Sequence, residues 1–196
     1  AAASDMVTDA QSALGLSLSE TSDLVDKMAA ASSKSNTSVQ QLGDAILTVG
    51  GTAKNLAGGT TELSTMLGVL ADNGITGAEG GTALRNMILS LSAPTDKAAA
   101  QLKALGVDAF DAEGNLRPLN ETFGDLNGAL SSLTQEQQTQ ALNEIFNKVD
   151  LKSVNAMLGT SAERFDELST AIDGAWVNMG SLSESLSDVG LDLTAM

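Results

Sequence analysis

Residues 56–93 restrict the possible folds of this chain more than any other stretch. Their apolar residues fall in two series with the i, i+3, i+4, i+7 spacing that places side chains on one face of a helix. The first series is Leu63, Met66, Leu67 and Leu70, and the second is Leu84, Met87, Ile88 and Leu91. The glycines between the series, at positions 74, 77, 80 and 81, end the first helix and keep the connection compact. The stretch therefore predicts a tightly packed helical hairpin.

The same helical spacing of apolar residues runs through most of the chain, and the composition supports it. Aromatic residues make up only 3% of the sequence, so a core has to be built from aliphatic side chains and methionine. That mixture favours helix packing over a β-sandwich, and only two prolines in 196 residues leave room for long helices. We predict a mainly α fold, a multi-helical domain of stacked helical hairpins.

The predicted hairpin at 56–93 is similar to the segment before it. A shift of 42 positions places Leu42 on Leu84 and Ile46 on Ile88, and no gap is needed over about forty positions. One interpretation is a repeat of two helix–turn–helix units, at residues 7–49 and 49–91, whose apolar faces stack on each other. The alternative is that any two adjacent amphipathic hairpins would align this well.

Between residues 107 and 118 the helical spacing stops. Two short apolar runs, Val107–Phe110 and Leu116–Leu119, flank the segment Asp111–Asn115, which contains the Asp, Gly and Asn residues typical of tight turns. This pattern predicts one small β-hairpin near 107–118, and Pro118 would restrict its second strand to the edge of a sheet.

The helical spacing resumes after the predicted β-hairpin, and we assign residues 1–172 to one helical core domain. Residues 173–196 differ, because their apolar residues recur at alternating steps of three and four, as in a coiled-coil seam. This C-terminal, heptad-like helix either packs back on the domain or begins a longer rod. Its candidate interaction residues are Trp176, Met179, Leu182, Leu186 and Val189.

The formal net charge of −15 argues against two classes of partner. Binding to nucleic acid requires clustered Lys and Arg, and binding to an anionic membrane requires a basic surface. We therefore expect neither nucleic-acid binding nor membrane binding by this chain. The sequence shows no signal peptide, and no apolar run approaches the ~18 residues of a transmembrane helix. Because the chain starts without Met, we expect it to be a piece of a longer protein.

Most catalytic sites cannot be built from this composition, because the chain contains no His and no Cys. That excludes a Ser-His-Asp triad and zinc sites with histidine or thiolate ligands. The densest group of carboxylates, Asp108, Asp111 and Glu113, lacks the spacing of an EF-hand and is better explained as a turn. A glycan hydrolase would need two suitably spaced acids in a cleft, and no such pair stands out. We expect no cofactor, no metal site and no enzymatic activity.

Several motifs in combination resemble the core region of phage tail tape measure proteins. They are Thr-Ser-x-x-x-Leu-Gly at 37–43, Leu-Gly-Val-Leu-Ala-Asp-Asn-Gly-Ile at 67–75, Gly-Thr-Ala-Leu-Arg at 81–85, Leu-Gly-Val at 105–107 and Asp-Ala-Glu-Gly-Asn-Leu-Arg-Pro-Leu at 111–119. The resemblance covers roughly residues 2–172. One departure is Leu-Ala-Gly-Gly at 56–59, where the family usually has a less glycine-rich turn.

The resemblance implies a structural virion protein of a phage or prophage. Tape measure proteins lie in the lumen of long tails, set tail length, have tail-tube subunits assembled around them and leave ahead of the DNA at genome ejection. The implied partners are other copies of this chain, tail-tube and tail-tip or baseplate proteins, and tail assembly chaperones. The implied locations are the tail lumen of the virion and, during assembly, the host cytoplasm. The alternative is a generic acidic helical interaction or scaffold domain without catalytic activity.

Overall fold

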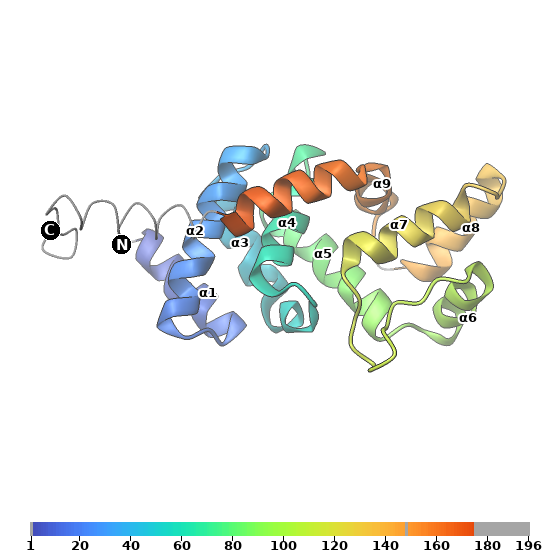
Figure 1. The fold of residues 1–196 in the computed structure, drawn as a ribbon, viewed down its shortest axis with the longest axis horizontal. Helices are drawn as coiled ribbons and strands as arrows, with labels where there is room; N and C mark the ends of the chain where they lie inside the picture. Colours follow the sequence, from blue (N-terminus) through green and yellow to red (C-terminus); the bar gives the residue numbers. More distant parts are fainter. Residues whose placement is uncertain (1, 148, 175–196) are drawn as a thin grey trace, which may run out of the picture.

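The structure, a computed structural model, describes residues 2–147 and 149–174. Its helices are α1 (Ala2–Leu14), α2 (Leu18–Lys34), α3 (Val39–Val49), the 3-10 helix η1 (Gly50–Asn55), α4 (Gly59–Asp72), α5 (Gly77–Ser92), α6 (Asp96–Leu105), α7 (Leu119–Leu130), α8 (Gln135–Ile145) and α9 (Leu151–Gly159) (Figure 1). Residues 162–174 form the last described helix. The predicted mainly α, multi-helical fold is confirmed. None of the described helices is long and apolar enough to cross a lipid bilayer.

Side-chain caps determine where several helices begin. Ser17, Ser38 and Thr134 each accept a hydrogen bond from the backbone N–H three residues later, and the Glu or Gln side chain at that position accepts one from the N–H of the cap. This reciprocal pair satisfies two N–H groups that a helix end leaves without partners. At the other end of α4 and α6, Gly74 and Gly106 have φ values of 75° and 68°, which only glycine adopts without strain.

Helices α2 to α5 form two hairpins that lie one on the other. Lys27 Nζ donates a hydrogen bond to Thr60 Oγ1 over 3.1 Å, and just after the end of α2 the Asn36 N–H donates to Oδ1 of Asp72, the last residue of α4, over 3.0 Å. The order of these contacts along the chain shows that α2 and α4 run in the same direction. The repeat at residues 7–49 and 49–91 stays a prediction.

Helices α3 and α5 also run side by side in the same direction. Gln41 Nε2 donates to Thr76 Oγ1 over 3.2 Å at the start of both helices, and farther along Gly81 lies against Ala45. A Cβ atom at position 81 would collide with the carbonyl oxygen of Ala45 and lie 2.7 Å from the Cβ of Thr48. Gly81 lies inside α5 and not in the connection where the sequence predicted it, and glycine at this position permits the close approach of α5 to α3.

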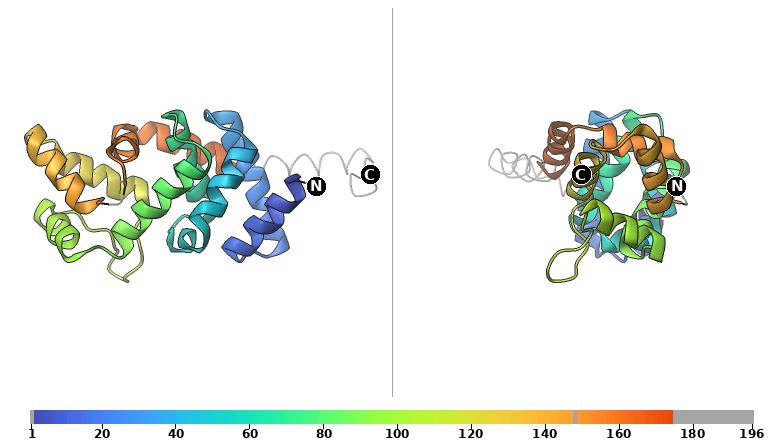
Figure 2. Two further views of the ribbon diagram at one scale, coloured as in Figure 1. Left: turned by 180° about the vertical axis from the view of Figure 1, so that it is seen from behind. Right: turned by 90° about the vertical axis from the view of Figure 1, so that its right-hand side faces the viewer.

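Helix α4 lies at the centre of the described part. Every residue from Glu62 to Ala71 is buried, so neighbours cover α4 on all sides. The last described helix covers one of these sides and runs antiparallel to α4. At its start, Arg164 forms an ion pair of 2.7 Å with Asp72, the last residue of α4, and at its end Asp173 accepts a hydrogen bond from Thr61 in the first turn of α4. The chain therefore returns from the far end of the molecule onto the first hairpins (Figure 2).

The molecule is elongated, with α1 towards one end and α8 at the other (Figures 1 and 2). At the first end, the Met6 side chain of α1 lies against Gly43 of α3. At the other end, helices α6 to α9 contact one another, and the ring of Phe123 in α7 stacks on that of Phe146, directly after α8, with the centroids 5.7 Å apart. Helix α9 contacts α4 and α5, so it joins this group to the two hairpins.

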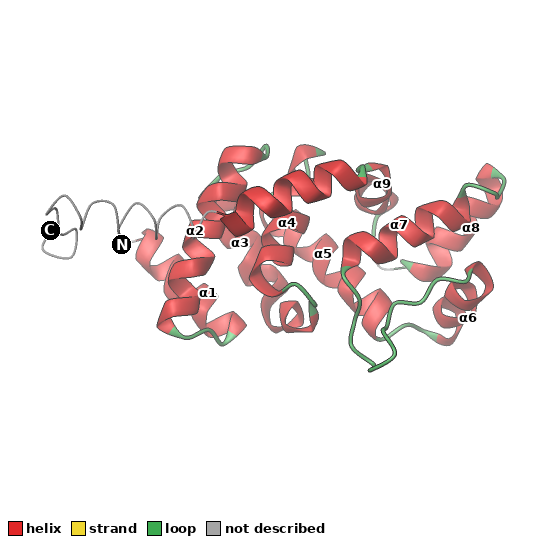
Figure 3. Ribbon diagram, viewed as in Figure 1, coloured by secondary structure: helices red, strands yellow, loops and turns green. Residues whose placement is uncertain are grey.

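The predicted β-hairpin near 107–118 is wrong. In the described part of the chain this segment is a loop that carries a single antiparallel bridge between Phe110 and Leu116, and no strand is formed (Figure 3). Two features prevent a longer ladder. The turn uses the five residues 111–115, and Pro118, which has no N–H to donate, is followed at once by α7.

Candidate interaction surface

The interaction residues predicted from the sequence, Trp176, Met179, Leu182, Leu186 and Val189, lie outside the described residues. The predicted domain boundary after residue 172 and the heptad-like helix over 173–196 also stay predictions. A candidate interaction surface in the described part has to be built from other residues.

One edge of the stacked hairpins gathers exposed apolar side chains. Helix α2 runs parallel to α4, and α3 runs parallel to α5, so α2 and α4 begin at the same edge of the stacked hairpins at which α3 and α5 end. We call this edge the lower edge, because it lies at the bottom of the hairpins in Figure 1. The large hydrophobic residues that are exposed in the described part are Leu18, Leu47, Leu89 and Phe110. The first three belong to the start of α2 and the last turns of α3 and α5, so they lie along the lower edge.

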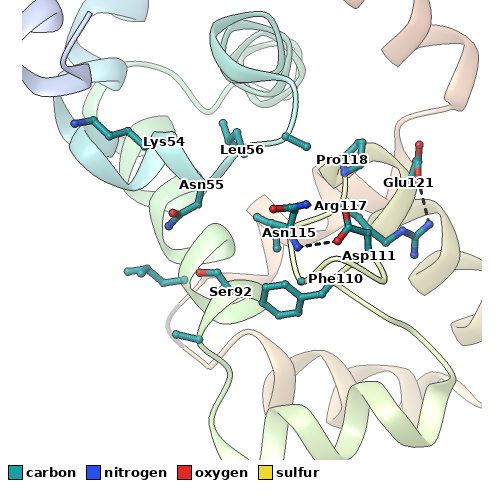
Figure 4. Close-up of a pocket in the computed structure, with 15 residues that line it drawn as sticks. Lys54, Asn55, Leu56, Ser92, Phe110, Asp111, Asn115, Arg117, Pro118 and Glu121 are labelled. Carbon is teal, nitrogen blue, oxygen red and sulfur yellow. Dashed lines mark hydrogen bonds and ion pairs between the residues drawn. The ribbon is translucent and has the colours of Figure 1, made fainter.

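Leu89 and Phe110 line the same open cleft, which has a volume of about 960 Å³ (Figure 4). One side of the cleft consists of η1 and the residues before α4, including Lys54 and Leu56. The end of α5 and the loop 107–118 form the other sides. The side chains of Leu89 and Phe110 are 43% and 40% exposed. Single exposed apolar residues are normal on a protein surface, but two that share one cleft indicate a contact surface.

The positive charge of Arg117 in the wall of this cleft is already used within the chain. Its guanidinium donates to Asp125 Oδ2 over 2.8 Å, to Glu121 Oε2 over 3.2 Å and to the carbonyl of Asp108 over 2.9 Å. The hydrogen bond to Asp125 raises the pKa of Arg117 above its ordinary value. These bonds connect the loop to the first two turns of α7. Arg117 therefore stabilises the wall of the cleft, and its charge is already paired within the chain.

The carboxylates Asp108, Asp111 and Glu113 belong to the turn of this loop. Asp111 Oδ1 accepts hydrogen bonds from the N–H groups of Asn115, over 2.7 Å, and Glu113, over 3.0 Å. The bond from the Asn115 N–H lowers the pKa of Asp111. Among the described residues, no group of three or more His, Cys, Asp or Glu is arranged to hold a metal ion. Asp111 therefore stabilises the turn, which is the role its sequence context indicates.

Glu62 of α4 is a buried carboxylate whose two oxygens both have partners. Oε1 accepts the N–H of Leu119 over 2.6 Å, and Oε2 accepts the N–H of Gly58 over 2.7 Å. Burial raises the pKa of Glu62 above its ordinary value, although these two hydrogen bonds act in the opposite direction. A carboxylate with a raised pKa is often a sign of a functional site. Here Glu62 satisfies free N–H groups at the starts of α4 and α7 and joins the two helices.

Comparison with known proteins assigns the chain to a family. The sequence profile of phage-related minor tail proteins matches residues 1–147. The chain belongs to the phage-related minor tail protein family. No solved structure gives a significant match to this member of the family.

Two relatives of the chain carry more specific names. The tape measure protein of Pneumococcus phage Dp-1 is 29% identical over 191 residues, which are 96% of this chain and 16% of the relative. The probable tape measure protein of Escherichia phage P2 is 31% identical over 165 residues, which are 82% of this chain and 20% of the relative. The chain therefore spans about a fifth or less of the length of these relatives. The resemblance to tape measure proteins is confirmed.

The cleft was not predicted from the sequence. A signal for one part of it was present, because the shift that places Leu42 on Leu84 also places Leu47 on Leu89, and both Leu47 and Leu89 are exposed. An apolar residue that recurs at the outward position of two similar helices indicates a contact surface. No comparable signal identified Phe110, since a β-strand would also have explained an apolar residue at that position.

Proposed function

We propose that this chain is part of a tape measure protein, a structural component of a phage or prophage tail that helps to set tail length and to template tail-tube assembly through protein–protein contacts. The match to two tape measure proteins over 96% and 82% of the chain carries the proposal. The proposed partners are other copies of this chain, tail-tube and tail-tip or baseplate proteins, and tail assembly chaperones. The proposed locations are the lumen of the tail and, during assembly, the host cytoplasm.

The architecture supports a role through contacts. A single helix rises about 1.5 Å per residue, whereas the described helices lie side by side and add much less length per residue (Figure 1). A folded part of this kind offers surface to partners more than it offers length. The net charge of −15 would also keep a protein in the tail lumen from adhering to DNA.

Deletion of residues 59–174, in frame, from the full-length gene tests the proposal. The tails should become shorter than those of the parent phage or should fail to assemble, as measured by negative-stain electron microscopy. A matched control is Gly128→Ala, whose new methyl group would meet nothing within 4 Å, and which should leave the tails unchanged. Tails of parental length and number after the deletion would overturn the proposal.

The alternative, a generic acidic helical interaction or scaffold domain, predicts a different location. A tape measure role requires peptides of this chain in purified virions and their loss from particles that have ejected their genome, which mass spectrometry can measure. Intact virions that lack these peptides would favour the generic domain.

A further inference from the structure

We propose that residues 175–196 of the same chain dock in the cleft formed by η1, the end of α5 and the loop 107–118. The proposal rests on the place where the described chain ends, on the apolar surface of the cleft and on the sequence of the segment that follows. It does not depend on the tail function proposed above.

The last described helix brings the chain to the lower edge of the hairpins. At its end, the Asp173 carboxylate accepts a hydrogen bond of 3.1 Å from Thr61, at the start of α4. Thr61 follows Ala57, a residue of the cleft, by four positions, and four residues span at most about 14 Å. The chain after Gly174 therefore begins within reach of the cleft, and a segment of 22 residues, 175–196, would measure about 33 Å even as a helix.

The cleft has unpartnered apolar surface and enough volume for several side chains. Its 960 Å³ lies at the upper end of the roughly 300–1,000 Å³ typical of ligand sites. Leu89 and Phe110 are the most exposed of its large apolar residues, whereas Leu56 and Leu116 in the same cleft are 6% exposed. A docked apolar side chain would remove Leu89 and Phe110 from water and continue the core at Leu56 and Leu116.

The sequence of residues 175–196 provides the complementary apolar stripe. Its candidate interaction residues, Trp176, Met179, Leu182, Leu186 and Val189, recur at steps of three and four. Side chains with this spacing share one face of a helix, and such a face needs a surface to cover it. The cleft is the part of the lower edge where two exposed apolar residues lie together.

Electrostatics favour this occupant over a second copy of the chain. The segment contains three acids, Glu184, Asp188 and Asp192, and no Lys or Arg. Among the charged residues that line the cleft, Glu121 is bound to Arg117, Asp111 is held in its own turn and the Lys54 ammonium lies beside Gly15, so the charge of the whole chain distinguishes the occupants. A second copy would bring another net charge of −15 towards the first, whereas a segment of the same chain arrives at a high effective concentration.

A fluorescence quenching experiment on the 196-residue chain tests the proposal, because the chain has one Trp and no Cys. The variant Leu89→Cys is labelled with bimane, a fluorophore that tryptophan quenches on contact. The quencher is Trp176 in the first variant. In two further variants it is introduced by Leu182→Trp or by Leu186→Trp, each combined with Trp176→Phe. Docking should quench the label from at least one of these three positions. The quenching should be independent of protein concentration.

A label on Leu18→Cys is the matched control, because Leu18 is 81% exposed on the same edge but does not line the cleft. That label should stay bright. Phe110→Asp should restore the fluorescence at position 89 while the circular dichroism stays unchanged, since Phe110 lies in a loop. The proposal is overturned if no position quenches the label at 89, or if Leu18→Cys is quenched equally. Quenching that disappears on dilution would identify a second copy as the occupant and would also overturn it.

Discussion

The hairpins α2–α5 and the helices α6–α9 achieve close packing with different residues. Residues 1–109 contain no aromatic residue, and α5 approaches α3 through Gly81, where a Cβ atom would collide with the backbone of α3. In the helices α6–α9, the buried rings of Phe123 and Phe146 instead stack on each other. A Cβ atom at Gly124 in α7 would meet nothing within 4 Å. Glycine is therefore a packing requirement in the first region and only a tolerated residue in the second.

This difference determines how substitutions act in the two regions. Where one helix backbone meets another, an added methyl group has no side chain to displace, so the cost arises from strain. Where two rings meet, a truncation leaves a cavity, so the cost arises from lost contacts. The hairpins should therefore be sensitive to added atoms and the helices α6–α9 to removed atoms.

The largest effect is expected from Phe123→Ala. The side chain of Phe123 is 2% exposed and stacks on Phe146 with an angle of 8° between the rings. Removing it should lower the free energy of unfolding by about 3–5 kcal/mol, because the space left by the ring can close only in part. Urea unfolding followed by circular dichroism measures the loss. A loss below about 1 kcal/mol would contradict the central place given to this ring pair.

Gly81→Ala should have the next largest effect, for the opposite reason. Its methyl group would collide with the carbonyl oxygen of Ala45, which is fixed in the backbone of α3. We expect a net loss of about 2 kcal/mol in the free energy of unfolding, after the roughly 1 kcal/mol that alanine contributes to helix formation. Gly43→Ala is the matched control, because its methyl group meets the flexible side chain of Met6. Equal losses in the two variants would show that contact with the rigid backbone is not the cause.

The sequence predicted most of the helices, because their determinants are local. The apolar spacing of 3.6 residues identified α4 and α5, and Gly74 marked the end of α4. Thr134 caps α8 together with Gln137, and the two residues are only three positions apart. Local patterns gave the wrong structure at 107–118. Turn residues flanked by apolar runs predict a β-hairpin there, but the flanking segments are too short to form more than one bridge.

The arrangement of the helices could not be predicted, because contacts between residues distant in the sequence decide it. Arg164 and Asp72 are 92 positions apart, and Arg164 also donates to the carbonyl of Lys34 over 2.6 Å. No local pattern connects these residues. The hydrogen bond from the Leu119 N–H to Glu62 spans 57 positions, and the sequence does not indicate it either. The cleft depends on this arrangement, so it could not be located before the helices were placed.

Glu62→Gln tests the contact between α4 and α7, which connects the two regions. It should change the free energy of unfolding less than Gly81→Ala does. An amide offers only one oxygen to the N–H groups of Gly58 and Leu119, so at pH 4 the free energy of unfolding should fall by about 1 kcal/mol. Burial raises the folded pKa of Glu62 above the value of 4.5 expected in the unfolded chain. The contribution of Glu62 is therefore complete below pH 4.5 and declines as the pH rises through the folded pKa.

The stability of Glu62→Gln relative to the wild type should accordingly improve between pH 4 and pH 7. Urea unfolding of both proteins across this range measures the difference, in which the effects of the other carboxylates cancel. Glu136→Gln, at an exposed position in the first turn of α8, is the control for a carboxylate-to-amide change at the surface. A difference that widens with pH would mean that the two hydrogen bonds outweigh burial.

Gly124→Ala should have the smallest effect and the opposite sign from Gly81→Ala. Position 124 lies inside α7 without a positive φ, and a methyl group there would meet nothing within 4 Å. The free energy of unfolding should therefore rise by up to about 1 kcal/mol, because alanine favours the helix more than glycine does. Thermal unfolding of Gly124→Ala and Gly81→Ala in parallel would show the change of sign. If Gly124→Ala were destabilising, something outside the described residues would have to cover that face of α7, and the two regions would then use glycine in the same way.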